Sequence, residues 1–142
     1  MSRWAWAEVD LEAVRHNVKV LCEIAAPAAV WAVVKADGYG HGAIPAARAA
    51  LDGGAGGLCV ALVQEGTALR DAGIDCPILV LSEQPPADLA DAMLAGLDLT
   101  VYSYAQVEAI AAAGGRQHPV HLKIDTGMHR VGAATADAVG LA

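Results

Sequence analysis

Basic side chains are scarce in this chain of 142 residues, and no segment of it gathers them together. Lys and Arg number 9 against 16 Asp and Glu, which gives a formal net charge of −7 at pH 7. Proteins that bind nucleic acid or anionic lipid carry clusters of Lys and Arg. We therefore expect neither a nucleic acid nor a membrane surface among the partners.

Long hydrophobic runs are missing as well, although the mean hydropathy is positive, at +0.41. The charge-free stretch 24–34 is broken by Pro27, whereas a bilayer span needs about 20 apolar residues. Glu8 and Asp10 follow Arg3 too closely to leave room for the apolar segment of a signal peptide. We expect no membrane span and no secretory leader.

Only three cysteines occur, at positions 22, 59 and 76, far apart and in apolar surroundings. Such a set is typical of reduced thiols in a cytoplasmic protein rather than of a disulfide framework. Apolar residues are abundant, at 56%, while charged residues make up 18%, so the chain must bury a core and is not disordered. The length suits one domain but falls short of the about 250 residues of a closed eight-stranded (β/α) barrel.

The N-terminal part predicts a strand followed by a helix. Residues 4–9 (WAWAEV) alternate large and small side chains, as a half-exposed strand does. Asp10 is suited to cap a helix, and apolar residues recur at helical spacing from Val14 to Cys22. Pro27 then ends the helix.

Five short apolar runs follow, and their starts lie about 20 to 27 residues apart, as in repeated βα units. The runs are nearly continuous in Val, Leu and Ile, which is typical of strands buried on both faces of a parallel sheet. An Ala-rich segment of helical length separates each run from the next, and glycines stand where these helices should end, at Gly73, Gly96 and Gly114. The runs are residues 30–35, 57–63, 77–81, 97–101 and 119–125.

This order of elements predicts a parallel α/β architecture, which occurs either as an open doubly wound sheet or as a barrel. Five parallel strands could form an open sheet by themselves. They could equally be the first five of eight, with a further helix beginning in residues 135–142. Periodicity does not separate the two, so the motifs have to decide.

The most informative motif is residues 33–42, VVKADGYGHG, in which Lys35 stands at the carboxyl end of a buried strand. Barrel and doubly wound enzymes place their chemistry at that end. A lone lysine there most often just reaches into water, and the glycines alone indicate a tight turn. Gly38, Gly40 and Gly42 could also form a dinucleotide fingerprint, but the third glycine comes one position early and Tyr39 is bulky where a pyrophosphate must approach.

Three segments together resemble the bacterial alanine racemase family. Residues 33–42 are similar to the family's pyridoxal-phosphate (PLP) attachment motif, residues 6–17 (WAEVDLEAVRHN) to its opening segment, and residues 120–132 (VHLKIDTGMHRVG) to its third hallmark. They occur in the family's order over essentially the whole chain. The resemblance implies an α/β fold, the first part (about five strands) of a (β/α)8 TIM-type barrel, preceded by a short strand and a helix.

The resemblance implies a cofactor site around Lys35. Racemisation removes a Cα proton of very high pKa, and PLP makes this possible by spreading the resulting charge into its ring. In the family the matching lysine carries PLP as a Schiff base and then acts as the base on one face, specific for the D-enantiomer. Tyr39 matches the tyrosine that hydrogen-bonds the cofactor phosphate, and Val33 is expected to line the cofactor site.

The third segment adds expected substrate-binding residues. Alternation along residues 120–125 puts the apolar side chains on one face and the polar ones on the other, where in a barrel they would line the interior. Arg130 matches a family arginine that contacts the substrate carboxylate and a cofactor oxygen, and Lys123 matches a lysine that is carbamylated in some members. His129 replaces a glycine that is common in the family.

The catalytic set is expected to be incomplete within residues 1–142, because the family's second base comes from a C-terminal β domain of the partner subunit. We expect this chain to be the N-terminal portion of an alanine racemase, inactive alone, cytoplasmic, and homodimeric when complete, in an enzyme that supplies D-alanine for peptidoglycan. The alternatives are a PLP-binding barrel of the PLP-homeostasis type without racemase activity, and a dinucleotide-binding open sheet. His118 and His121 are an odd number of residues apart in a strand and point to opposite faces, so no metal site is expected.

Overall fold

The computed structural model describes residues 4–142, and its first helix, α1, spans Leu11–Ala25. The side chain of Asp10 accepts a hydrogen bond from the Ala13 amide at 3.0 Å, so Asp10 is the N-cap that the sequence predicts. The helix ends two residues before Pro27, as expected. Its buried residue, Val18, packs toward α3 (Ala43–Asp52).

The predicted strand over residues 4–9 is wrong. These residues lie in neither a helix nor a strand, and the side chains of Trp4 and Trp6 are 96% and 83% exposed. Alternation of side chains forms a strand only where a neighbouring backbone supplies hydrogen bonds. No strand within residues 4–142 pairs with this segment, so the pattern alone does not suffice.

The five predicted strands are all present, each shorter than its apolar run. They are β1 (Trp31–Val33), β2 (Gly57–Val60), β3 (Ile78–Val80), β4 (Leu99–Val101) and β5 (Val120–Leu122). The helical segments between and after them are α2 (Lys35–Tyr39), α3, α4 (Val63–Asp71), the 3-10 turn η1 (Pro86–Asp88), α5 (Leu89–Leu94), α6 (Tyr104–Ala112) and α7 (Ala138–Leu141).

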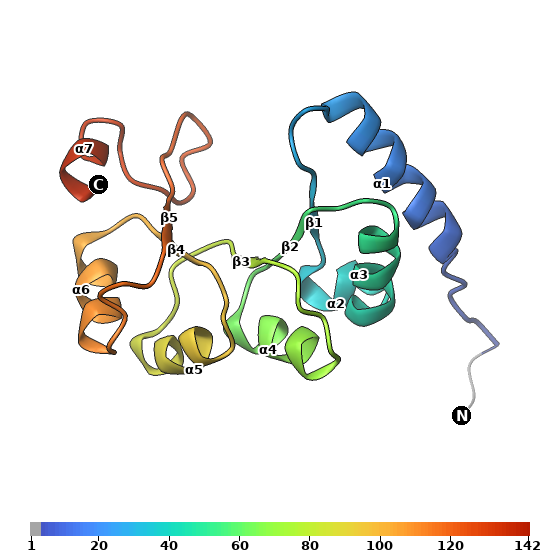
Figure 1. Cartoon of the computed structure of the whole chain (residues 1–142), viewed down its shortest axis with the longest axis horizontal. Helices are drawn as coiled ribbons and strands as arrows, with labels where there is room; N and C mark the ends of the chain where they lie inside the picture. The colour runs from blue at the N-terminus through green and yellow to red at the C-terminus, as the bar shows by residue number, and fades with distance from the viewer. Residues whose placement is uncertain (1–3) are drawn as a thin grey trace.

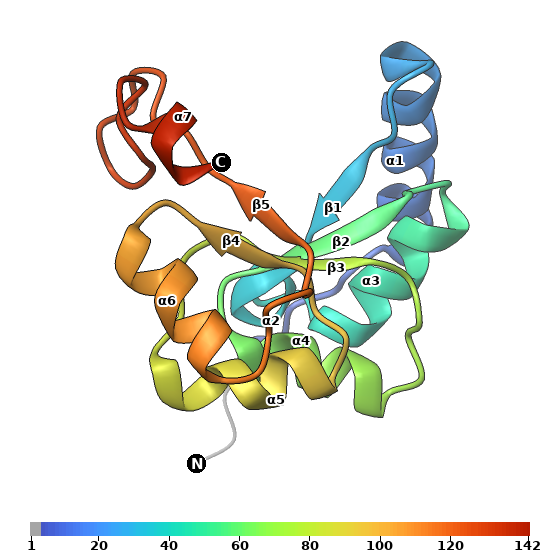
Figure 2. The ribbon, with the colours of Figure 1, turned by 60° about the vertical axis from the view of Figure 1, so that its left-hand side comes forward.

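The strands are parallel and lie side by side in chain order (Figure 1). β1, β2 and β3 form one ladder and β4 and β5 a second, and a single parallel bridge between Leu79 and Asp98 joins them. The helices α3 to α6 lie along one side of the strands, as the two views show (Figures 1 and 2). This is the predicted succession of βα units.

The sheet is curved, and two side chains from its outermost strands show by how much. Trp31 of β1 and His121 of β5 have ring centroids only 6.4 Å apart, in an edge-to-face arrangement. In a flat sheet four strand spacings would separate β1 from β5 by about 19 Å. The curvature, visible in Figure 2, is that of a partial barrel rather than of an open flat sheet.

The core lies between the sheet and the helices. Residues at alternate strand positions are fully buried there, among them Leu58, Val60, Ile78, Val80 and Leu99. The intervening residues point to the opposite side of the sheet, which we call the open face; it carries Trp31 and His121. The predicted C-terminal glycines of three helices are confirmed, since Gly73, Gly96 and Gly114 have φ values of 76°, 59° and 96°.

Within residues 4–142 none of the helices combines the length and the apolar character that crossing a bilayer requires.

Candidate functional site

Lys35 follows directly on β1, at the edge of the sheet where the strands end, which we call the carboxyl edge. The last ladder bond between β1 and β2 runs from the Val34 amide to the Cys59 carbonyl at 2.9 Å. Ala32 and Val34 pack toward the core, so Val33 between them faces the open side. The Lys35 side chain is half-buried, and its Nζ lies 6.0 Å from the centre of the Tyr39 ring.

The residues after Lys35 form a left-handed turn. Ala36, Asp37, Gly38 and Tyr39 have φ values of 51°, 53°, 61° and 56°, so three residues with a side chain adopt a conformation that favours glycine. Each such residue costs roughly 1–2 kcal/mol relative to a right-handed conformation. The turn needs compensating contacts, and it brings Tyr39 back over Lys35.

Hydrogen bonds from three side chains hold this turn. Glu65 Oε1 accepts from the Ala36 amide at 2.7 Å, and Asp37 Oδ1 accepts from the Ala43 amide at 2.8 Å. His41 Nδ1 donates to the Gly38 carbonyl at 2.8 Å. Sequence reasoning missed Glu65, because Leu62, three residues before it, is not the Ser or Thr that marks a capping box.

Lys123, the lysine for which a carbamate was considered, also lies on the open face. Its Nζ donates a hydrogen bond to the Leu81 carbonyl at 3.1 Å, and the side chain is half-buried. Leu122 packs against the core, whereas His121 lies against Trp31 and places Nε2 3.7 Å from Asp98 Oδ2. Leu122 and His121 thus lie on opposite faces of β5, as predicted, whereas Val120 and Ile124 remain 42% and 40% exposed.

Arg130 lies in the exposed loop after β5. Within residues 4–142 no hydrogen bond or ion pair joins its guanidinium to Lys35, Tyr39 or any other side chain, so the structure does not bring it to Lys35. The loop is held by Asp125, whose Oδ1 accepts from the amides of Gly127 at 2.9 Å and His129 at 3.1 Å. These two bonds hold the pKa of the Asp125 carboxyl below its usual value. His129 has a φ of 56°, a conformation that the family's glycine would adopt freely.

The cysteines are not placed as nucleophiles. Cys22, Cys59 and Cys76 are free thiols, and burial raises the pKa of the Cys59 and Cys76 thiols. A thiol with a raised pKa is less often in the reactive thiolate form.

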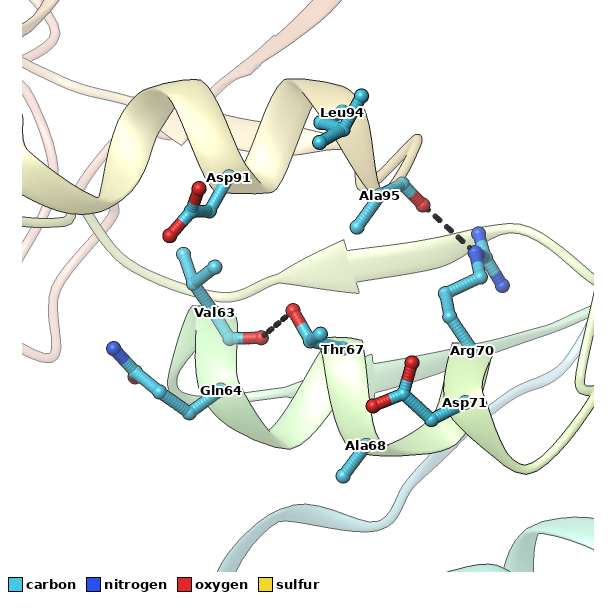
Figure 3. Close-up of a pocket in the computed structure, with 9 residues that line it drawn as sticks. All are labelled: Val63, Gln64, Thr67, Ala68, Arg70, Asp71, Asp91, Leu94 and Ala95. Carbon is cyan, nitrogen blue, oxygen red and sulfur yellow. Dashed lines mark hydrogen bonds between the residues drawn. The ribbon is translucent and has the colours of Figure 1, made fainter.

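A groove of about 470 Å³ lies on the helical side, between α4 and α5 (Figure 3). Two of its polar side chains are engaged with the protein, since Thr67 Oγ1 donates to the Val63 carbonyl and Arg70 Nε donates to the Ala95 carbonyl. Lys35 and Tyr39 do not line it. Because neither residue lines it, the groove is not the site of the expected chemistry.

The match to a family of known proteins covers nearly the whole chain. The family described as "Alanine racemase, N-terminal domain" matches residues 9–142. The chain belongs to this family. The parallel βα units are those of the first part of the family's barrel, and the dinucleotide-binding open sheet considered above is excluded.

Curated alanine racemases are similar in sequence over most of this chain. That of Desulforamulus reducens is 47% identical over 141 residues, which are 96% of this chain and 38% of the relative. That of Thermobifida fusca is 50% identical over 140 residues, 96% of this chain and 37% of the relative. The chain thus spans less than two fifths of the length of these relatives.

Solved alanine racemases agree in fold. The enzyme of Clostridium difficile 630 in complex with cycloserine superposes with a TM-score of 0.86 at 32% identity, over 99% of this chain and 40% of that one. The enzyme from E. faecalis gives a TM-score of 0.81 at 39% identity, over 94% of this chain and 38% of that one.

Proposed function

We propose that this chain is the N-terminal portion of a PLP-dependent alanine racemase that interconverts L-alanine and D-alanine. Family membership and the names of the relatives support the reaction. The observation that carries the proposal is the Lys35 amine, half-buried at the carboxyl edge with its Nζ 6.0 Å from the centre of the Tyr39 ring.

The residues at this edge fit a cofactor with an aldehyde and a phosphate. An aldehyde is held by a primary amine, and the chain contains three lysines, of which Lys19 is exposed on α1 and Lys123 donates to a carbonyl. Of the three lysines, Lys35 is therefore the one whose amine lies beside a tyrosine and is suited to hold the aldehyde. Tyr39 is 60% exposed, so its side chain is accessible to a phosphate.

Each residue then has a defined task. Bound PLP supplies the electron withdrawal that makes the Cα proton of alanine removable. Lys35 would hold the cofactor covalently at rest and, once the amine of the substrate has replaced it there and left it free, would act as the base on one face that takes and returns the Cα proton of the D-enantiomer. The Tyr39 hydroxyl donates to the phosphate, and Val33 lines the cofactor site from the open face.

The substrate carboxylate is assigned to Arg130, which has to move toward the carboxyl edge from its exposed loop. Lys123, if carbamylated, becomes an anion that pairs with this guanidinium in a bidentate manner. The proposal extends to a homodimer in the cytoplasm that supplies D-alanine for peptidoglycan. The resemblance in sequence motifs supports the dimer, the location in the cytoplasm and the role in peptidoglycan supply.

The test of cofactor binding is a covalent label. The protein, with the full chain that its native organism makes, is incubated with PLP and its visible absorbance is recorded. The adduct is then reduced with borohydride, and the labelled residue is identified by peptide mass spectrometry. We expect the label on Lys35, its loss in Lys35→Ala, and its retention in the matched control Lys19→Ala. Label absent from Lys35 in folded protein would overturn the proposal.

The test of the reaction is the loss of optical rotation of L-alanine. Lys35→Ala should lose turnover by several orders of magnitude, since the cofactor anchor and one base disappear together. If PLP labels Lys35 but L-alanine keeps its rotation, the protein is a PLP-binding barrel of the PLP-homeostasis type and not a racemase.

A further inference from the structure

We propose that Glu65 is a positioning residue for Lys35, acting through the left-handed turn that follows it. This inference rests on the proposed function, since it assigns Lys35 as the amine that holds PLP. Glu65 lies in the first turn of α4, 29 residues away from Ala36 in sequence, yet its carboxylate joins the loop after β1 to the loop after β2.

The bridge stands where the ladder between β1 and β2 ends. The Val34 amide still bonds to β2, and the Ala36 amide, two residues further along the chain, lies 2.7 Å from Glu65 Oε1. On the β2 side the amides of Ala61 and Leu62 donate to Glu65 Oε2 at 2.8 and 3.1 Å. One carboxylate thus serves three N–H groups that the sheet leaves unpaired.

A carboxylate is the side chain that this position requires. Both oxygens of an ionised carboxyl accept hydrogen bonds, whereas an amide offers one oxygen and turns an N–H₂ group toward the other donors. The negative charge also lies at the N-terminus of α4, where the helix dipole favours it. Glu65→Gln therefore keeps the size of the side chain and breaks one half of the bridge.

The position of Ala36 links the bridge to the amine. Ala36 is the first residue with a positive φ, and it is bonded directly to Lys35. The bond to Glu65 fixes the point at which the extended strand changes to a left-handed turn, and hence the direction in which the Lys35 side chain leaves the backbone. Without it, the strain of the turn favours rearrangement of the segment that carries both Lys35 and Tyr39.

A second carboxylate provides a matched control. Glu83 accepts from the Tyr102 amide at 2.6 Å and from Ser103 Oγ at 3.0 Å, so it joins the loops after β3 and β4 in the same way. It makes no hydrogen bond to residues 35–42. Glu83→Gln should lower stability like Glu65→Gln but should leave the Lys35 segment in place.

The first measurement needs no variant and no cofactor. In hydrogen exchange of the unaltered protein, the Ala36 amide should be protected to nearly the degree of the Val34 amide. Exchange of Ala36 at the rate of an open loop overturns the inference, whether or not any variant folds.

The second measurement compares Glu65→Gln with Glu83→Gln. We expect the dissociation constant of PLP to rise about 10- to 100-fold in Glu65→Gln alone, which is the loss of one hydrogen bond to a charged group. In the racemase assay kcat should fall while the KM for alanine changes little, because the substrate contacts are not touched. If the two variants hold PLP equally well, the inference is wrong.

The outcome distinguishes this inference from the proposed function. If the unaltered protein takes no PLP on Lys35, the proposed function fails irrespective of Glu65. If the unaltered protein is labelled on Lys35 and Glu65→Gln is labelled with equal affinity, the proposed function stands and the positioning role is overturned.

Discussion

Arg70 is only half-buried, yet removing its side chain should destabilise this fold strongly. It lies in the last turn of α4 and donates four hydrogen bonds to backbone carbonyls at the edge where the strands begin. Nε and Nη2 reach the carbonyls of Ala95 and Gly96, at 2.9 and 3.0 Å, and Nη1 reaches those of Ile74 and Cys76, at 2.7 and 2.8 Å. The guanidinium therefore fastens the loops that precede β3 and β4.

The expected magnitude follows from these four bonds. An intramolecular hydrogen bond contributes a net of about 0.5–1.5 kcal/mol, and the loops at this edge give water some access to the carbonyls once the guanidinium is gone. We therefore expect Arg70→Met, which keeps an apolar stem, to lower the free energy of unfolding by about 3 kcal/mol. For a domain of this size that corresponds to a fall in melting temperature of roughly 10 °C.

The assay is thermal and urea unfolding of the protein followed by circular dichroism, with Arg48→Met as the matched control. Arg48 is exposed and donates one hydrogen bond, from Nη2 to the Ala72 carbonyl at 2.8 Å. Its loss should cost no more than about 1 kcal/mol. Equal stability of the two variants would refute the reasoning, because the loss of unfolding free energy would then not depend on how many carbonyls the arginine hydrogen-bonds.

Two further variants test the core and the pH dependence. Leu58→Ala, at a fully buried position, should cost about 2–5 kcal/mol in urea unfolding, whereas Leu94→Ala, at a position 89% exposed, should change stability by less than about 0.5 kcal/mol. The folded-state pKa of Asp125 is lowered below its ordinary 3.8 by the amides of Gly127 and His129, so its stabilising contribution is present above that value and is lost as the pH falls through the lowered pKa. The stability difference between the unaltered protein and Asp125→Asn should accordingly shrink from about pH 7 to about pH 2, and a difference that is constant or grows on acidification would contradict the assignment.

The strands were predictable because burial on both faces leaves a direct mark on the sequence. Leu58 and Val60 face the helices while Cys59 between them is also buried, so the run reads as continuous apolar residues. An apolar run of this kind predicts where a strand is centred better than it predicts where the strand ends. The predicted run 119–125 forms a ladder only over Val120–Leu122, since Asp125 pairs with the Ala133 backbone instead.

The site was predictable in part for the same reason. A lysine at the end of a buried strand is visible in the sequence, and so is the tyrosine four residues later. The left-handed turn that brings them together is not, because Ala36, Asp37 and Tyr39 have no local preference for a positive φ. The conformation depends on contacts such as that of Glu65, which only the folded chain brings to Ala36.

Acidic and basic side chains bond the backbone at opposite edges of the sheet for one physical reason. In a row of parallel βα units every helix begins at the carboxyl edge with unpaired N–H groups and ends at the other edge with unpaired carbonyls. Glu65 and Glu83 accept from N–H groups at the first edge, and Arg70 donates to carbonyls at the second. Because Glu65 accepts from the amides of Ala36, Ala61 and Leu62, these three amides are not free to bind a phosphate. In the proposed function the hydroxyl of Tyr39 donates to the phosphate instead.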